Sequence, residues 1–128
     1  MAEQADTLHT LGGVIVDSAL KVHKELGPGL LESVYEHCLA HELSKRGIHV
    51  KRQAAVPIQY DGESLDAGLR LDLLVNDMIV VEIKAVEKVI PVHAAQLLTY
   101  LKLSGKRMGF LINFNVRLLK EGIRRYVL

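Results

Sequence analysis

The chain has 128 residues, a formal net charge of +1 and hydrophobic residues at 49% of its positions, as expected for one globular domain with a substantial core. The near-neutral charge weakly disfavours a protein that holds nucleic acid by bulk electrostatics alone, so any nucleic-acid contact must be local or shared between subunits. The single cysteine, Cys38, excludes an internal disulfide framework, a cysteine-based zinc site and a four-cysteine iron–sulfur cluster.

The chain shows no targeting or membrane signal. No apolar run approaches the ~20 residues that a membrane span requires, and residues 1–10 lack the apolar segment of a signal peptide. We therefore expect a cytoplasmic protein with no membrane partner. We also expect residues 1–128 to form a single domain, with a flexible tail over residues 1–6.

Apolar residues at helical spacing predict two helices at the start of the chain. The first runs from about Thr7 to Leu26 and ends at Gly27-Pro28-Gly29, because glycine suits a helix cap and proline cannot continue a helix. The second helix runs from about Leu30 to Arg46. Its expected apolar stripe consists of Leu31, Val34, Cys38, Leu39 and Leu43.

The pattern changes to alternation after the second helix. Residues 48–60 predict a strand, and the Asp61-Gly62 pair that follows indicates a turn. Residues 69–75 and 78–85 predict two further strands, joined as a hairpin around Asn76-Asp77. The residues expected on one side of the first strand are Val50, Val56, Ile58 and Tyr60.

The last third of the chain predicts one helix and two strands. Residues 93–103 follow Pro91 and precede a break at Ser104-Gly105, as a helix would. Residues 108–114 are continuously apolar, which is typical of a buried strand, and residues 123–127 predict a short last strand. The resulting order is helix, helix, three strands, helix and two strands, with α-β-β-β-α-β as its core, and it predicts an α/β fold in which a central mixed sheet is flanked by helices.

Polar side chains interrupt the two hairpin strands. Side chains alternate across a strand, so Glu82 and Lys84 must share a face with Val80, and a charged pair there is costly to bury unless it is used or paired. The opposite face of that strand consists of Ile79, Val81, Ile83 and Ala85, which we expect in the core.

The register of the hairpin decides whether Asp72 meets Glu82. A two-residue turn at Asn76-Asp77 would place Asp72 opposite Val81, on the wrong face. A three-residue loop or one β-bulge would restore the match, and we predict one of these. In the Asp72 strand we expect one face to hold Leu69, Leu71, Leu73 and Val75 and the other to hold Arg70, Asp72 and Leu74.

Three motifs, in the expected order along the chain, resemble those of the PD-(D/E)XK nuclease superfamily. Asp72 to Lys84 has the spacing D-x9-E-x-K, and Gln96 to Tyr100 matches the QxxxY motif of its RecB-like members. Gly29 to Tyr35 is similar to the GxxExxY signature of a bacterial family assigned to that superfamily. The resemblance covers about residues 14–125, and Leu71 departs from it by replacing the proline of the PD pair.

The resemblance implies a restriction-endonuclease-like core and a Mg²⁺-dependent nuclease that hydrolyses phosphodiester bonds of DNA, or less readily RNA. Mn²⁺ is an alternative metal, since both ions prefer oxygen ligands. Asp72 and Glu82 would be direct metal ligands, with the backbone carbonyl of Ile83 as a third. Glu32 would bind the metal directly or through water.

The resemblance also assigns roles to residues beside the metal. Lys84 would orient the attacking water and offset charge at the phosphate. Gln96, four residues before Tyr100 on one helix face, would anchor the active-site network, and Tyr100 would support it. His93, Tyr35 and Arg70 are expected to support the site or contact nucleic acid. A homodimer is an additional expectation, because pairing would enlarge the DNA-binding surface.

Each of these residues also has a simpler interpretation. Glu32 can be a helix-start carboxylate, and His93 a helix-start residue. Glu82 with Lys84 can be a surface ion pair, Asp72 with Arg70 can be solvated, and Gln96 with Tyr100 can border a core helix. The alternative function is a catalytically silent nuclease-like fold kept as a module for nucleic-acid or protein binding, since function does not follow from fold.

Overall fold

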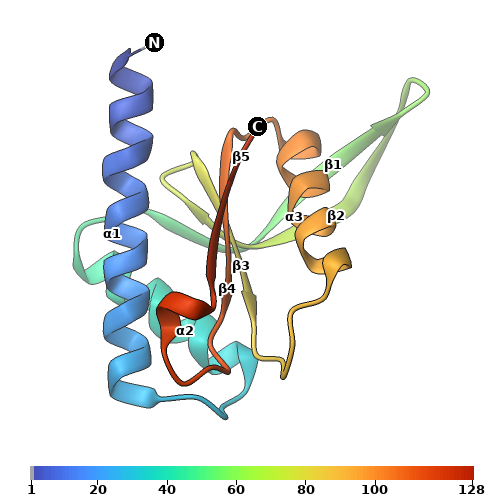
Figure 1. The fold of residues 1–128 in the computed structure, drawn as a ribbon. Helices are drawn as coiled ribbons and strands as arrows, with labels where there is room; N and C mark the ends of the chain where they lie inside the picture. Colours follow the sequence, from blue (N-terminus) through green and yellow to red (C-terminus); the bar gives the residue numbers. More distant parts are fainter. Residues whose placement is uncertain (1) are drawn as a thin grey trace.

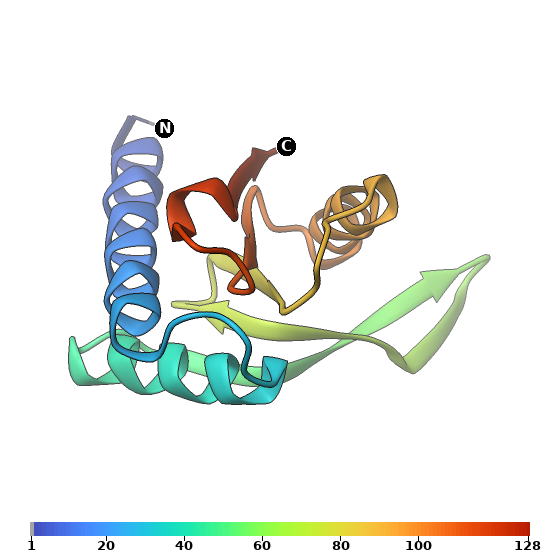
Figure 2. The same cartoon turned by 60° about the horizontal axis from the view of Figure 1, so that its bottom comes forward.

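A computed structural model describes residues 2–128 as a five-stranded sheet packed between helices, as Figures 1 and 2 show. Helices α1 (Ala2–Leu26) and α2 (Glu32–Lys45) cover one face of the sheet. Helix α3 (Pro91–Ser104) packs against the other face.

The sheet has the strand order β1-β2-β3-β4-β5, and its β3–β4 pair is parallel while all other pairs are antiparallel. Helix α3 makes the crossover between the two parallel strands. The strands are β1 (Val50–Tyr60), β2 (Glu63–Val75), β3 (Ile79–Lys84), β4 (Met108–Asn113) and β5 (Ile123–Val127), and a short 3₁₀ helix, η1 (Leu119–Glu121), precedes β5. The expected α/β architecture, a mixed sheet flanked by helices, is confirmed.

The two N-terminal helices differ in detail from the expectation. Helix α1 begins at Ala2 instead of Thr7, so residues 2–6, expected as a flexible tail, belong to its first turns. Helix α2 begins at Glu32, and Leu31 caps it in an extended conformation with 74% of its surface exposed. Leu31 therefore does not belong to the apolar stripe, which consists of Tyr35, Leu39, Ala40 and Leu43 with the carboxylates Glu36 and Glu42 also buried.

Two hydrophobic clusters fill the space on either side of the sheet. The larger lies under α1 and α2, and its centre includes Ile15, Leu39 and Ile83, all fully buried. The smaller lies under α3 around Leu97 and Leu101. On β3 the expected alternation is confirmed: Val80 packs in the smaller cluster, and the residues that pack in or against the larger one are Ile79, Val81, Ile83 and Ala85.

The alternation predicted for β2 is wrong beyond Asp72. Leu73 and Val75 pack under α1 and α2, whereas Leu69 and Leu71 pack on the α3 side. Four leucine and valine side chains at spacing two therefore do not share one face. The side chains at spacing two change from one face of the sheet to the other at Asp72, and the periodicity of the sequence does not predict this change.

Strand β1 changes face at the same level, so its predicted one-sided pattern is also wrong. Val50 packs in the larger cluster, but Val56 and Ile58 pack in the smaller one, and Tyr60 is 75% exposed. Gln53 causes the change: its φ of +50° is a left-handed conformation in the middle of a strand. The β1–β2 register is the same on both sides of this point, with Arg52 opposite Leu73 and Ala54 opposite Leu71.

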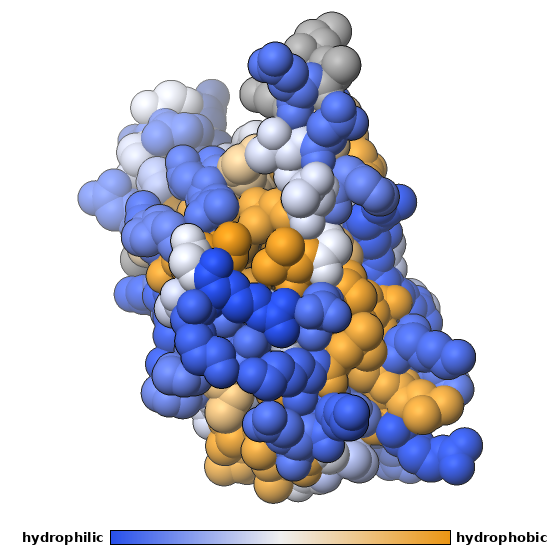
Figure 3. Space-filling view, turned by 90° about the vertical axis from the view of Figure 1, so that its left-hand side faces the viewer, coloured by the Kyte–Doolittle hydropathy of each residue, from blue (hydrophilic) through white to orange (hydrophobic). Residues whose placement is uncertain are grey.

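The outer parts of the molecule are a protruding hairpin and a grooved face beside α1. The distal part of the β1–β2 hairpin extends past α3 in both ribbon views. Figure 3 shows apolar surface beside the polar outer side of α1, and a groove of about 480 Å³ there lies between α1 and the β4–β5 edge. Within residues 2–128, no helix has both the length and the apolarity to cross a membrane.

The turn before β5 gives a test of the packing. A Cβ at Gly122 would clash with the Asn113 backbone oxygen, so we expect Gly122→Ala to lower the free energy of unfolding by about 1–3 kcal/mol. Gly13→Ala is the control, because no atom lies within 4 Å of its added Cβ and alanine favours a helix by about 0.5–1 kcal/mol. Urea unfolding followed by circular dichroism measures both, and equal stabilities would contradict this packing.

Candidate functional site

Strands β2 and β3 separate at Asp72 and Glu82, and these two side chains fill the gap. The last paired residues are Leu73 and Val81, and Val75 opposite Ile79 leaves a three-residue loop, as predicted. Beyond the last pair, the Asp72 backbone N–H donates to Glu82 Oε2 at 2.9 Å. The Ile83 backbone N–H donates to Asp72 Oδ2 at 2.8 Å. The two carboxylates therefore replace ladder hydrogen bonds and lie side by side.

Lys84 connects the two carboxylates with helix α3. Its Nζ donates to Gln96 Oε1 at 3.5 Å, and Gln96 Nε2 donates in turn to the Tyr100 hydroxyl at 2.8 Å. The predicted juxtaposition of the ExK strand with the QxxxY helix is therefore present in the geometry. Glu82 is only 5% exposed, which excludes the simpler interpretation of Glu82 and Lys84 as a surface ion pair.

The loop after Lys84 is fixed by a buried asparagine that the sequence did not single out. Asn113 is 3% exposed and closes two hydrogen bonds with the Val86 backbone, at 3.1 and 3.0 Å. The Phe114 N–H also donates to the Lys84 carbonyl at 2.9 Å. These bonds hold the end of β3 against the end of β4 and so limit where the Lys84 side chain can go.

Glu32 enters from the first turn of α2, and its helix start is held by Tyr35. The Tyr35 hydroxyl donates to the Gly27 carbonyl at 2.6 Å and accepts from the Leu30 N–H at 3.1 Å. Its ring stacks on Phe114 with centroids 4.6 Å apart. Gly29 has a φ of +95°, which a side chain would make unfavourable. Gly29 and Tyr35 thus fix the loop before α2 and the start of that helix, and so fix the position of Glu32 in its first turn.

Two of the expected supporting residues have structural positions instead of exposed ones. Tyr35 is fully buried, and its hydrogen bonds to Gly27 and Leu30 hold the start of the helix that carries Glu32, so of its two expected parts the supporting one fits its place better than contact with nucleic acid. His93 Nδ1 accepts from the Ile90 N–H at 3.2 Å at the start of α3, which favours the helix-start interpretation. Arg70 is exposed, and its guanidinium donates to the Gln53 carbonyl at 3.3 Å.

A second layer of polar residues, which the sequence did not predict as part of the site, lies behind Asp72. Glu36, one turn after Glu32 on α2, is 8% exposed and accepts two hydrogen bonds from Arg52, at 3.2 and 3.1 Å. The Gln53 amide donates to Glu36 Oε1 at 2.6 Å and to Asp72 Oδ1 at 3.4 Å. The available signal was the i, i+4 spacing of Glu32 and Glu36 on the same helix face.

The carboxylates of the site repel one another in a partly buried setting. Burial, with the nearby charge of Asp72, raises the pKa of Glu82 to about 8. Burial also raises the pKa of Asp72, with the charge of Glu36 adding to the effect. Burial and the charge of Asp72 raise the pKa of Glu32. Lys84 opposes all three shifts, so one lysine faces three carboxylates.

This excess of negative charge fits a hard divalent cation. Within residues 2–128, no three His, Cys, Asp or Glu side chains converge as a ready-made metal site. Mg²⁺ does not require one, because it keeps several waters and binds through one or two carboxylates. Asp72 and Glu82 supply two adjacent carboxylates, and Glu32 lies close enough for the charge of Asp72 to raise its pKa.

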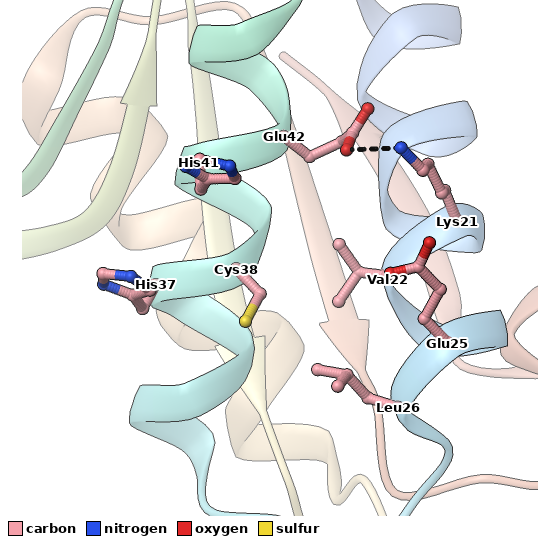
Figure 4. A pocket seen from close by; sticks show the side chains of 8 residues that line it. All are labelled: Lys21, Val22, Glu25, Leu26, His37, Cys38, His41 and Glu42. Carbon is pink, nitrogen blue, oxygen red and sulfur yellow. Dashed lines mark hydrogen bonds and ion pairs between the residues drawn. The ribbon is translucent and has the colours of Figure 1, made fainter.

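A separate cavity of about 280 Å³ lies between α1 and α2, away from these residues (Figure 4). Lys21 on α1 donates to Glu42 Oε1 on α2 at 3.0 Å at one end of it, while Val22, Leu26 and Cys38 face one another across the helices. His37 points away from α1 in this view. Acids, histidines and Cys38 all line this cavity, but within residues 2–128 no hydrogen bond joins Cys38 to a histidine or a carboxylate, so we assign the cavity no part in the site.

The raised pKa of Glu82 predicts how metal-free stability depends on pH. The unfolded chain ionises Glu82 near the ordinary glutamate pKa of 4.5, whereas in the folded protein the pKa is raised to about 8. Stability from this group is therefore complete below pH 4.5 and is lost as the pH rises toward 8. In EDTA at pH 8, we expect Glu82→Gln to be more stable than the wild type, and the difference to shrink at pH 5.

The size of this effect is a few kcal/mol at most, since one pKa unit corresponds to about 1.4 kcal/mol. Urea unfolding at several pH values measures it. Glu63→Gln, on the exposed hairpin, is the matched control and should leave the pH profile unchanged. A Glu82→Gln variant that is less stable than the wild type at pH 8 would show that the ionised Glu82 carboxylate does not destabilise the metal-free protein.

Comparison with known proteins agrees with this geometry. The family model described as the PD-(D/E)XK nuclease superfamily matches residues 9–126. No curated protein and no solved structure matches the chain. The matched region includes every residue of the acidic site, strands β1 to β4 and all of β5 except Val127. The chain therefore belongs to the PD-(D/E)XK nuclease superfamily.

Proposed function

We propose that the protein is a Mg²⁺-dependent nuclease that hydrolyses phosphodiester bonds of DNA in preference to RNA, with Mn²⁺ as an alternative metal. One observation carries the proposal: Asp72 and Glu82 exchange hydrogen bonds with each other's strands at the point where Lys84 reaches Gln96. This arrangement gathers the acids and the lysine of the superfamily at one end of β3. An ordinary surface ion pair would not bury Glu82.

Asp72 and Glu82 would hold the metal, with the Ile83 carbonyl as a third ligand and Glu32 acting through water. When bound, the metal supplies a water of lowered pKa and stabilises charge on the phosphoryl oxygens. The chain's own contribution is to keep the two carboxylates fixed, because Asp72 Oδ2 and Glu82 Oε2 are each held by a backbone N–H. Fixed ligands avoid reorganisation during the reaction.

Lys84 would orient the attacking water and offset charge at the phosphate. Its positive charge lowers the pKa of each of the three neighbouring carboxylates, so we assign Lys84 an electrostatic role and not that of a general base. Gln96 would hold the ammonium in place through Oε1, and the Tyr100 hydroxyl would fix the orientation of the Gln96 amide. Gln96 is then a positioning residue, and Tyr100 acts through it.

Within the superfamily, we propose that the chain is a member of the GxxExxY family. The support is physical: the glycine and the tyrosine of that signature fix the position of its glutamate, Glu32. A cytoplasmic location and a homodimer remain predictions. The apolar groove beside α1 offers surface for pairing two copies (Figure 3).

The alternative is a binding module that has kept the fold without catalysis. The net charge of +1 favours it, because a protein that cleaves long DNA gains from a more basic surface. The alternative and the nuclease predict different outcomes in a cleavage assay, since only the nuclease requires Glu82 and Lys84 for turnover.

We expect the purified protein to cleave linear, circular or single-stranded DNA in Mg²⁺ or Mn²⁺, and to cleave RNA of the same sequence more slowly. Glu82→Ala and Lys84→Ala should each reduce the cleavage rate roughly 100-fold or more, because the first removes a metal ligand and the second removes the charge that offsets that of the reacting phosphate. Gel electrophoresis of labelled substrates measures the rates.

Glu87→Ala and Lys88→Ala are matched controls, because both residues are exposed in the loop just beyond β3. These two variants should cleave DNA at the wild-type rate. Equal cleavage by all five proteins would identify a contaminant. Cleavage by none of them, with DNA binding retained, would overturn the nuclease in favour of the binding module.

Metal binding should also be visible as stability. A ligand that binds only the folded state raises the melting temperature. At pH 8, 10 mM MgCl₂ or 1 mM MnCl₂ (roughly saturating for a weak site) should raise the melting temperature of the wild type but not that of Glu82→Ala. Differential scanning fluorimetry measures the shift, and an equal shift in both proteins would place the metal elsewhere.

A further inference from the structure

Gln53 has an unusual backbone conformation for its place in the fold. It lies within β1, yet its φ of +50° is in the left-handed region that residues other than glycine and asparagine rarely adopt. The other non-glycine residues of residues 2–128 with positive φ are Asp61, Asn76 and Asp77, all at hairpin turns. Strain of this kind persists only where surrounding contacts enforce it, and it concentrates at functional sites.

The contacts that enforce the conformation lie on both sides of Gln53. The Gln53 carbonyl accepts a hydrogen bond from Arg70 Nη1 at 3.3 Å. The preceding residue, Arg52, is tied to Glu36 by two hydrogen bonds. The Gln53 side chain is thereby directed to the same face as Arg52, toward α2 and Asp72.

The side-chain amide of Gln53 joins two carboxylates. Its Nε2 lies 2.6 Å from Glu36 Oε1 and 3.4 Å from Asp72 Oδ1. Ionised carboxylates only accept hydrogen bonds, so the NH₂ group and not the amide oxygen must face them, and its two hydrogens match the two acceptors. Asp72 is then held at both oxygens, by Gln53 at Oδ1 and by the Ile83 N–H at Oδ2.

We propose that Gln53 is a positioning residue whose strained backbone fixes the Asp72 carboxylate for a divalent cation. This inference rests on the proposed function, because it assigns Asp72 as a metal ligand. A carboxylate held by one donor can rotate, whereas one held by donors at both oxygens presents its remaining lone pairs in a fixed direction. Residues that orient a metal ligand in this way affect metal affinity without touching the metal.

Two substitutions separate the amide from the backbone strain. Gln53→Gly removes the amide and relieves the strain, because glycine accepts positive φ. Gln53→Ala removes the amide and keeps the strain. In EDTA, Gln53→Gly should therefore unfold at a higher urea concentration than Gln53→Ala, while both should bind Mn²⁺ roughly 10-fold or more weakly than the wild type by isothermal titration calorimetry.

Asp61→Gly is the matched control. Asp61 has a φ of +51° at the hairpin turn between β1 and β2, so the change relieves comparable backbone strain in an exposed turn and should leave Mn²⁺ affinity unchanged. A residue with a purely structural role would alter the urea midpoint and leave the Mn²⁺ affinity of the folded protein as it was.

The outcomes distinguish the two proposals. If the wild type binds Mn²⁺ and Gln53→Gly binds it with equal affinity, the role of Gln53 is overturned while the proposed metal site stands. A urea midpoint for Gln53→Gly below that of Gln53→Ala overturns the strained conformation. Failure of the wild type itself to bind Mn²⁺ overturns the proposed function and the positioning role with it.

Discussion

The site depends on the exchange of hydrogen bonds between Asp72 and Glu82 at the point where β2 and β3 separate. Each carboxylate accepts from a backbone N–H of the other strand region, at 2.9 and 2.8 Å, so two groups of like charge are held close together. The repulsion and the burial are both visible in the raised pKa of Glu82. A folded protein that keeps such a pair does so at a cost in stability, which a bound cation would offset.

The elements around this pair are arranged to supply partners from both faces of the sheet. Helix α2 contributes Glu32 from one side, and helix α3 contributes Gln96 from the other. The parallel pairing of β3 with β4 places Lys84 beside Asn113, whose side chain anchors the following loop. The site is therefore built from segments far apart in the sequence, each of them fixed by backbone hydrogen bonds or by the core.

The change of face at Gln53 and Asp72 connects the fold to the site. In a regular hairpin, side chains at spacing two along a strand would stay on one face of the sheet and pack against one helical layer throughout. Here the side chains at spacing two on β2 pack under α1 and α2 at Leu73 and Val75 but against α3 at Leu69 and Leu71. Asp72 can meet both Glu82 and the α2 carboxylates because it lies at this irregularity, between the two cores.

The sequence by itself determined the α/β class, the order of the elements and the superfamily, because these follow from periodicity, turn residues and motif spacing. It required a three-residue loop or a β-bulge if Asp72 was to meet Glu82, and the tertiary structure decided for the loop. The sequence did not determine the faces of Leu69, Leu71, Val56 and Ile58, or the parts played by Glu36, Arg52 and Gln53. Those depend on one left-handed residue in a strand, and a glutamine carries no local preference for that conformation. Only the tertiary contacts of Gln53 with Glu36, Asp72 and Arg70 impose it.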